Sequence, residues 1–423
     1  MTTPSLIIRP LASDEEYTAY FRMAVAAFST HPSEEAVQRR KHSLHMSPVF
    51  RPEQVRGAFR DGQQVGGYIM HEHQLRMGSA RISTGCIGTV VTSTQHRKQG
   101  IASALMQDAI EFAHQHNHAL LLLDGIPNFY YRYDYIDMFD VSLVEVDRSA
   151  ILARTPAAYQ VRIATVDDAA ALLALYKRHF QRYTGSFERS PELQAYRLQY
   201  THNPTMVALS EQGQIIGYLR YSQEDDVHVG REIAADNWDA LLALLQYHAN
   251  VFDPDKAPTS LQYLLPLDSP MTQWMIDTLE VPDTSHWDAP SLEWGVRGMS
   301  YHHRFAGWMA RLTDLHLLMR SILPELRARW RRSLAQWTGA ISFSVAGEAC
   351  TLQVAGNDVQ IVATPPASTP RLELTAQAVV QLVFGYRALS QLTDLAHLSE
   401  EAASALSILF PTGHTWIPAS DWF

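Results

Sequence analysis

A pattern that occurs twice limits the folds that this chain can adopt. The segment LIIRPLASDEE (residues 6–16) resembles YQVRIATVDDA (residues 159–169), and in both a β-rich run leads into an acidic helix start. A second pair, DGQQVGGYIM (residues 61–70) and EQGQIIGYLR (residues 211–220), is typical of a turn between two strands. The offsets within the two pairs are 153 and 150 residues. Two separate signals with nearly the same spacing predict a duplicated module of about 150 residues, and chance similarity of short turn segments is the alternative.

The last third of the chain has a different pattern. A helix is predicted across FAGWMARLTDLHLLMRSILPELRARW (residues 305–330). Apolar residues then alternate with polar ones in three short runs separated by turn residues, as an antiparallel meander requires. Helical patterns follow from Thr375 to Gly385 and from Glu400 to Leu409. We therefore expect an α/β (α+β) fold of three units, with the boundaries 1–155, 156–297 and 298–423.

Composition excludes several classes of protein. A chain of 423 residues with 46% hydrophobic content is long enough for several cores. Its start has no basic region followed by an apolar run, and no stretch approaches the roughly 20 apolar residues of a membrane span. The formal net charge of −10, without a long basic run, argues against nucleic acid and anionic membranes as partners. We expect a cytoplasmic protein.

Cysteines and histidines give no sign of a metal site. Cys86 and Cys350 lie far apart and match no zinc spacing, so we expect both to be buried as small hydrophobic residues. His114, His116 and His118 alternate, but at a helix end this spacing distributes them over different faces, and we expect surface histidines. The sequence therefore predicts no metal.

A basic turn stands directly in front of a helical pattern. The run CIGTVVT (residues 86–92) predicts a buried strand, and an apolar stripe typical of an amphipathic helix begins at Ile101. The amide groups at a helix start are unpaired and lie at the positive end of the helix dipole, which favours a phosphate. Gly100 permits close approach of the backbone, while Arg97 and Lys98 add positive charge. The chain between strand and helix is therefore a candidate phosphate cradle.

The turn has the pattern R-x-x-G-x-A, at Arg97, Gly100 and Ala102. By itself the pattern is weak, and a basic helix start with a glycine turn is the alternative. Neither G-x-x-x-x-G-K-[ST] nor G-x-G-x-x-G occurs in the chain, which excludes the usual nucleoside triphosphate and dinucleotide sites. A further buried strand follows at residues 119–123, and then a loop rich in tyrosine. The tyrosines of that loop are Tyr130, Tyr131, Tyr133 and Tyr135.

This order of strand, turn, helix, strand and tyrosines resembles the GCN5-related N-acetyltransferases, the GNAT superfamily. The resemblance implies that the turn binds the pyrophosphate of acetyl-CoA, a co-substrate. It also implies a bulge in the strand before the turn, whose amides, that of Val91 among them, hold the acyl arm. One tyrosine then protonates the departing thiolate. The residues implied in cofactor binding are Val90, Val91, Thr92, Arg97, Lys98, Gln99, Gly100, Ile101, Ala102 and Ser103.

Over its whole length the chain resembles the enhanced intracellular survival (Eis) family of acetyltransferases. That family has two tandem GNAT-like mixed-sheet modules followed by an α+β domain similar to sterol carrier proteins. Its motif Y-x-R-[FY]-G-[YF] corresponds to residues 130–135, where Asp134 replaces the usual Gly. The register favours Tyr130 over Tyr131 as the general acid. The family ends on an aromatic residue whose carboxylate enters the active site, so the resemblance implies a catalytic role for Phe423.

The second module lacks the R-x-x-G-x-A turn, and we expect a degenerate copy that shapes the substrate cleft. The resemblance implies acetyl transfer to an amine of a small molecule or of a lysine side chain, in a homo-oligomer that is a hexamer in that family. Trp422 before the end points to an aromatic wall, so a polycation resembling an aminoglycoside is not assumed as the acceptor. The alternative is a lipid, sterol or acyl-CoA binding protein without transferase activity, with Val379 to Phe384 lining an apolar cavity.

Overall fold

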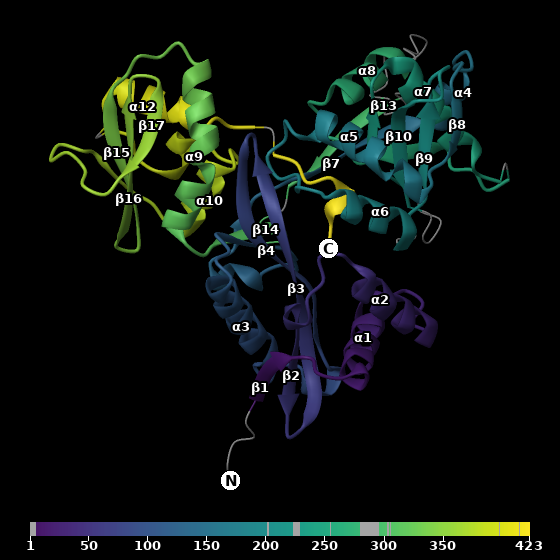
Figure 1. Ribbon diagram of the computed structural model, residues 1–423, viewed down its shortest axis with the longest axis horizontal. Coiled ribbons are helices and arrows are strands. Elements are labelled where there is room, and N and C mark those ends of the chain that lie inside the picture. Colours follow the sequence, from purple (N-terminus) through teal and green to yellow (C-terminus); the bar gives the residue numbers. More distant parts are fainter. Residues whose placement is uncertain are drawn as a thin grey trace, which may run out of the picture.

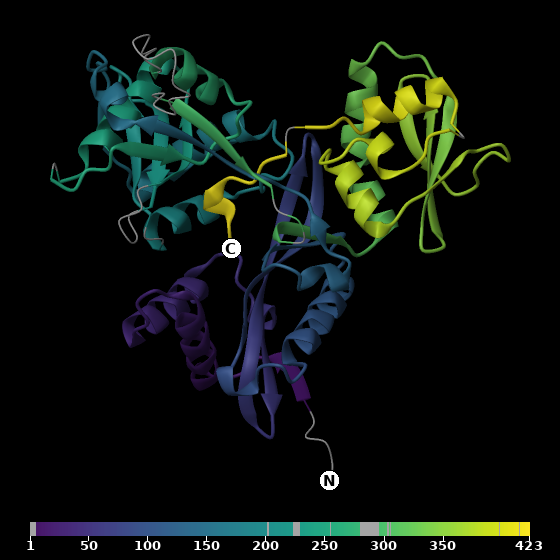
Figure 2. The same cartoon turned by 180° about the vertical axis from the view of Figure 1, so that it is seen from behind.

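Three sheets organise the chain, and each belongs to one of three lobes (Figures 1 and 2). Both views place the C-terminal end in the middle of the molecule, where the lobes meet. The computed structural model describes residues 6–200, 203–222, 229–253, 255–279, 296–302, 304, 306–396, 398–413 and 415–423.

The first sheet has the strand order β1-β2-β3-β4-β5-β14-β6. Helices α1 (Asp14–Phe28) and α2 (Glu34–Met46) lie on one side of it, and α3 (Ile101–Gln115) on the other (Figure 1). The predicted stripe of α3 is confirmed, since Ile101, Leu105 and Ala109 are buried against the sheet. The strands are β1 (Leu6–Pro10), β2 (Val55–Arg60), β3 (Gln63–Met77), β4 (Ala80–Thr92), β5 (Leu120–Gly125), β6 (Ile136–Asp137) and β14 (Gly307–Leu312).

The second sheet repeats this plan in the order β8-β9-β10-β11-β12-β7-β13. In both sheets four strands pair antiparallel, and a helix then crosses to a fifth strand that pairs parallel with the fourth. The predicted duplication is therefore confirmed. The strands are β7 (Val141–Asp147), β8 (Gln160–Ile163), β9 (Thr205–Leu209), β10 (Ile215–Tyr221), β11 (Val229–Ala235), β12 (Ser260–Tyr263) and β13 (Val296–Tyr301). The helices are α4 (Arg148–Leu152), α5 (Ala169–Phe180), α6 (Pro191–Tyr200), α7 (Trp238–Asn250) and α8 (Pro270–Leu279).

Arg9 and Arg162 stand at the same position of the two repeated segments, and they make the same kind of contact. Arg9 donates to the carboxylate of Glu16 over 2.9 and 2.6 Å. Arg162 donates to the carboxylate of Asp168 over 2.7 and 2.9 Å. In each case the carboxylate also accepts a backbone N–H from the segment that leads into the helix. The arginine therefore ties the first strand of each module to the start of its first helix.

The two modules exchange a strand. Strand β7 follows β6 in the sequence, yet it pairs with β12 and β13 of the second sheet. Strand β14 follows the second module and pairs with β5 and β6 of the first sheet. Each of these two sheets therefore includes a strand from beyond the boundary expected at 155 or at 297. The division into separate units at these residues stays a prediction. The helix predicted from residue 305 is wrong at its start, because Gly307–Leu312 is a strand and Asp314 caps a helix that begins at Leu315.

The third sheet confirms the predicted meander, with the order β17-β16-β15-β18. Helix α9 (Leu315–Arg332) packs on this sheet and reaches the first module, where Ser79 donates its amide N–H to Glu325 over 2.8 Å. Both cysteines are buried, as predicted. None of the described helices is long and apolar enough to cross a membrane. The other elements are β15 (Gly339–Val345), β16 (Glu348–Ala355), β17 (Asp358–Val362), β18 (Arg371–Glu373), α10 (Ala376–Val383), α11 (Leu389–Leu392) and α12 (Glu400–Leu409).

Candidate active site

Strand β4 contains a bulge. Its register with β3 shifts between Gly67 and Ile69, so that Thr89 and Val90 together stand opposite one residue of β3. Thr89 has a left-handed φ of 51°, which a residue other than glycine rarely adopts. The hydroxyl of the buried Tyr20, on α1, donates to the carbonyl of Thr89 over 2.8 Å. Tyr20 therefore supports the bulge from the side of the sheet that α1 covers, whereas α3 covers the other side.

Strands β4 and β5 separate beside this bulge. They pair only from Thr84 to Cys86, and the described strands do not pair beyond that point. Ser93 donates its N–H to Val65 of β3. Since successive amides of a strand point to opposite sides, the Val91 amide also faces β3, whereas the amides of Val90 and Thr92 face the open edge. That edge can accept a molecule that forms backbone-like hydrogen bonds.

The turn between β4 and α3 spans residues 93–100. Lys98 and Gly100 have left-handed φ values of 60° and 80°, and such turns present amide groups to anions. Gly100 is the N-cap of α3, and no side chain caps the helix. A Cβ on Gly100 would meet nothing within 4 Å, so the glycine is needed for its φ and not for space.

The side chains of this turn are largely open to solvent. The exposed residues are Arg97, Lys98, Gln99, Gly100 and Ser103, while Ala102 is half-buried and Ile101 is buried. The carboxamide of Gln99 accepts a hydrogen bond from Arg60 and donates to the carbonyl of Gln95 over 3.2 Å. The turn therefore combines an uncapped helix start with exposed positive charge.

Tyr130 and Tyr131 have opposite environments on a short helix after β5. Tyr130 is buried in the core of the first module, and its ring lies against Gly125 at the end of β5. Tyr131 is 42% exposed. Burial, and then the charge of Asp124, raise the pKa of Tyr130 to about 12. At neutral pH the phenol of Tyr130 therefore keeps its proton.

The departure at Asp134 does not change the turn of this motif. Asp134 ends the short helix in the left-handed conformation, with φ 62° and ψ 19°. Glycine adopts this conformation without strain, and aspartate is among the residues that tolerate it best. The register of the tyrosines is therefore the one that a glycine would give.

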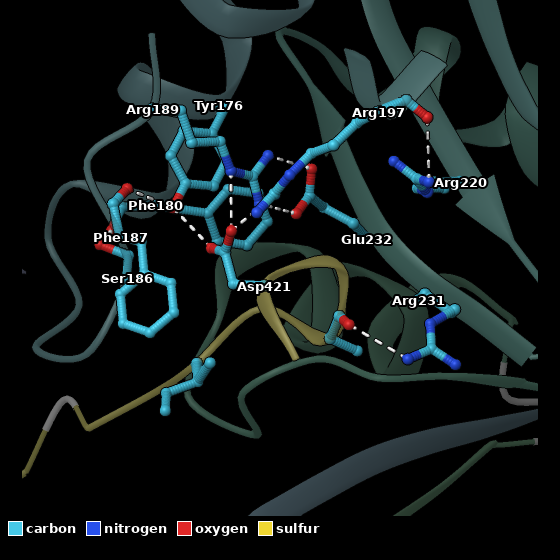
Figure 3. A network of polar contacts seen from close by, with 12 residues as sticks. Tyr176, Phe180, Ser186, Phe187, Arg189, Arg197, Arg220, Arg231, Glu232 and Asp421 are labelled. Atoms are coloured by element: carbon cyan, nitrogen blue, oxygen red, sulfur yellow. Dashed lines mark hydrogen bonds and ion pairs between the residues drawn. The ribbon is translucent and has the colours of Figure 1, made fainter. Parts of the chain in front are cut away.

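The C-terminal segment crosses from the third lobe to the second (Figure 1) and is fixed there by polar contacts (Figure 3). Trp416 donates its backbone N–H to the carbonyl of Thr184 over 2.8 Å. The carboxylate of Asp421 accepts from Arg189 over 3.0 Å, from Tyr176 over 2.9 Å, and pairs with Arg197 at 2.6 Å. The side chains of Asp421 and Arg189 are both 0% exposed.

Charge balance explains how Asp421 stays ionised inside the protein. Burial opposes its ionisation, but Arg189 and Arg197 together hold the pKa of Asp421 well below its usual range. Arg189 also donates to both oxygens of Glu232, over 2.9 and 2.6 Å, and lies 3.5 Å above the Tyr176 ring. The segment is thus held by a buried charge cluster, two residues before its end.

Phe423 lies against the first module. Its ring centroid is 5.4 Å from that of Trp308 on β14 and 5.9 Å from that of His71 on β3. Its carboxyl carbon is 3.4 Å from the position that a Cβ on Gly88 would occupy. Gly88 precedes Thr89 of the bulge, so the carboxyl group of Phe423 lies next to the point where β4 and β5 separate.

A cavity of about 530 Å³ opens beside this carboxyl group. The helices α1 and α2 of the first module and α6 of the second module form its walls. Ile69, His71, Thr89 and Phe423 also line it. None of residues 93–103 lines it, so the cavity and the turn approach the bulge from different directions.

The second module has no comparable turn. Only residues 236 and 237 connect β11 to α7. Asn237 caps α7 with its own side chain, which accepts the N–H of Ala240 over 2.8 Å. Asp236, directly before the cap, pairs with Arg178 at 2.7 Å. The start of α7 therefore has a side-chain cap and a carboxylate in the place where α3 has an open backbone.

Several residues near the site were missed by the sequence analysis. Asp421 and its two arginines are brought together over more than 200 positions, which no local pattern reveals. The alternation of His71 and His73 could have predicted that both lie on one face of a strand, because alternate residues of a strand share a face. In the structure their ring centroids are 6.4 Å apart, and the rings are stacked.

The expected exposure of His118 is wrong. It is 4% exposed, contacts Ser83 at 2.9 Å, and lies 3.0 Å from Glu72, because it begins the turn into the buried strand β5. In the described parts of the chain no group of three or more His, Cys, Asp or Glu side chains is placed to hold a metal.

The chain is similar to known proteins in its first module and in its fold. Residues 8–136 match the family model of the acetyltransferase (GNAT) domain. No curated protein sequence matches the chain significantly.

Solved structures share the fold over the full length of the chain. A probable N-acyltransferase from Enterococcus faecalis has a TM-score of 0.72 at 16% identity, with 100% of both chains covered. A GCN5-related N-acetyltransferase from Anabaena variabilis has a TM-score of 0.70 at 13% identity, covering 99% of this chain and 100% of that one. Eis1 from Mycobacterium abscessus has a TM-score of 0.62 at 16% identity, with the same coverage. The chain thus has the mixed α/β fold of these proteins, and its first module is an acetyltransferase (GNAT) domain.

Proposed function

We propose that the protein transfers the acetyl group of acetyl-CoA directly to an amine of a small molecule or of a lysine side chain. The observation that carries the proposal is the arrangement of three features along β4 and the turn that follows it. These features are the open strand edge, the uncapped start of α3, and the carboxyl group of Phe423.

The chain offers fitting groups for each part of acetyl-CoA. The turn at Lys98 and Gly100 supplies amide groups and positive charge for the pyrophosphate. The open edge of β4 can hydrogen-bond the acyl arm. Negative charge develops on the thioester oxygen during attack and requires a fixed donor, for which the amide of Val90 is better directed than that of Val91.

Tyr130 is suited to protonate the departing thiolate. Its raised pKa keeps the phenol protonated, and a general acid must hold its proton until the leaving group takes it. The exposed Tyr131 lacks this environment. The assignment of Tyr130 therefore rests on the register of the resemblance and on its burial.

The carboxylate of Phe423 has a more limited role. Its pKa of about 3.5 makes it too weak to remove a proton from a free ammonium group with a pKa near 10. It can accept the proton as the amine becomes positively charged during attack, and it can orient the incoming ammonium. Asp421, two residues earlier, fixes the backbone that carries it.

The alternative, a lipid or sterol binder, finds less support in the third domain. The residues from Val379 to Phe384 that could line an apolar cavity include five that are buried in the largest core cluster. They pack there with residues of α9 and of the third sheet. We further propose, on the resemblance alone, that this domain is related to sterol carrier proteins, and that the protein forms a cytoplasmic homo-oligomer.

A change at the chain end tests the proposal. Acetyl-CoA and a panel of amines are supplied, and free thiol is measured. Glycines added after Phe423 should lower kcat by about 10²-fold or more, since the charge moves while every side chain remains. Acetyl-CoA affinity and the thermal midpoint serve as controls and should change little. An extended variant with wild-type turnover would exclude the carboxylate, and wild-type protein that releases no thiol with any amine would exclude the function.

A further inference from the structure

The cavity beside Phe423 is unusual in its charge. Its lining includes two arginines of α2, Arg39 and Arg40, and no aspartate or glutamate among the described residues. The nearest acidic side chain of β3, Glu72, points away and pairs with Arg51 and His118. The negative charge in the lining is therefore the carboxylate that we assign to Phe423.

Arg40 is available to bind a ligand. No hydrogen bond or ion pair joins it to another described residue, whereas Arg39 lies 3.9 Å from Glu35. The charge of Arg40 also acts on the hydroxyl of Tyr20, which donates to Thr89 at the bulge. Thr89 and Arg40 line the same cavity. The guanidinium group of Arg40 therefore belongs to the cavity that the bulge lines.

One of the two histidines that line the cavity, His71, adds no cation at neutral pH. Burial lowers the pKa of His71 to about 4, so its imidazole is neutral. A ligand in this cavity thus meets a carboxylate at one end and guanidinium groups on α2. A guanidinium group binds carboxylates and phosphates through paired hydrogen bonds. A polycation would instead bring further positive charge next to Arg40, which has no acidic partner among the described residues.

We propose that the acceptor is a small amine that also carries a carboxylate or phosphate group, with Arg40 as its anion-binding residue. The amine is directed to the carboxylate of Phe423, and the anionic group lies against α2. A cavity of about 530 Å³ has the size of a small-molecule site, which favours such a ligand over a protein lysine. This inference rests on the proposed acetyl transfer and narrows its substrate class.

A matched series of amines tests the inference through thiol release. The series has an aliphatic acid with a terminal amine, its primary amide, and the diamine of the same length. An amino-alkyl phosphate separates the two anionic groups, and an acidic peptide with one lysine represents a protein acceptor. We expect kcat/KM for at least one anionic amine to exceed that of the amide and the diamine by about tenfold or more. Equal values, or a preference for the diamine or the peptide, would overturn the inference.

Two variants locate the preference. Arg40→Gln should raise KM for the anionic amine by about tenfold or more, with little change in kcat and none for the neutral amide. Lys41→Gln removes the same charge from the next position of α2, but Lys41 pairs with Asp14 and does not line the cavity, so the preference should persist. Loss of the preference in Lys41→Gln alone, or retention in Arg40→Gln, contradicts the assignment.

Binding keeps the inference distinct from the catalytic proposal. Calorimetry with the amino acid of the series should show weaker binding in Arg40→Gln than in wild-type protein. If no amine releases thiol but this difference is found, acetyl transfer is excluded and the anion site remains. If thiol is released and the difference is absent in both binding and KM, the transferase remains and the anion site is excluded.

Discussion

The two modules share one strand order and differ where a ligand would bind. In the first, residues 93–100 form a turn that leaves the start of α3 uncapped. In the second, two residues replace this turn, and Asn237 satisfies the start of α7 from within the chain. The same strand order is therefore compatible with both connections, and the phosphate cradle that we propose for the first module depends on the connection and not on the sheet.

A second difference concerns a buried tyrosine that both copies keep. In the first module Tyr68 donates to Asp108 over 2.8 Å, and Asp108 pairs with Arg56. In the second module Tyr218 donates to Glu232 over 2.7 Å, and Glu232 pairs with Arg189.

The arginine of the second copy has a further partner. Arg189 also holds Asp421, and so connects this module to the end of the chain. We therefore expect the second module to hold the C-terminal segment in place beside the first module.

The largest effect should come from Asp421→Ala. It leaves Arg189 and Arg197 without their shared carboxylate in a buried site, which costs about 3–5 kcal/mol of unfolding free energy. Asp108→Ala is the matched change in the first module, where the pair with Arg56 is 17–18% exposed, and it should cost clearly less. Chemical denaturation of the two variants measures this. Equal losses would show that the second network is no special anchor.

Tyr130→Phe should lower kcat by about 10²-fold without changing acetyl-CoA affinity, because only the proton donor is removed. Tyr131→Phe is the control and should keep wild-type kcat, since that side chain faces solvent. The raised pKa of Tyr130, about 12, further predicts that alkaline loss of the acid begins only well above pH 10. A loss of kcat in Tyr131→Phe instead would shift the register by one residue.

Gly100→Asp should weaken acetyl-CoA binding by about tenfold or more, since a carboxylate at the start of α3 repels the pyrophosphate and a side chain strains the left-handed turn. The matched change in the second module is Asn237→Asp, which keeps a good cap and should leave the affinity unchanged. Calorimetry with acetyl-CoA distinguishes the two. Unchanged affinity in Gly100→Asp would remove the cradle from the first module and with it the contrast between the copies.

The smallest effect is expected for Asn237→Ala. Loss of the cap on α7 should lower stability by about 1 kcal/mol, because the N–H of Ala240 loses its acceptor. Acetyl-CoA affinity and kcat should not change. If the affinity fell as well, the second module would contribute to cofactor binding after all.

Local sequence patterns predicted most of the helices and strands, but they could not predict which strands distant in sequence pair with one another. The repeat, the stripe of α3 and the meander each follow from residues close in sequence, with periods of 3.6 or 2. The segment Gly307–Leu312 was predicted as part of the helix over residues 305–330, which in the structure begins only at Leu315. Its place as a strand depends on an open position between β5 and β6, which no local pattern encodes.

The candidate site divides in the same way. The turn with Gly100 and the tyrosines at 130 and 131 are contiguous motifs, and the sequence could therefore locate them. Arg40 is one of two arginines in α2, and only the folded chain distinguishes it from Arg39, which lies near Glu35. The role of Asp421 likewise depends on its ion pairs with arginines of another module, which the sequence does not reveal.

The exchanged strand has a consequence for synthesis on the ribosome. Leu312 of β14 pairs with Leu120 of β5, so this sheet cannot close until 192 further residues have been made. At typical elongation rates that takes roughly 10 to 40 seconds. During this interval the apolar edge at Leu120–Leu123 lacks its partner and is prone to pair with other chains. A nascent chain that pauses before residue 307 should therefore depend on chaperones, and a fragment that ends at residue 155 should aggregate.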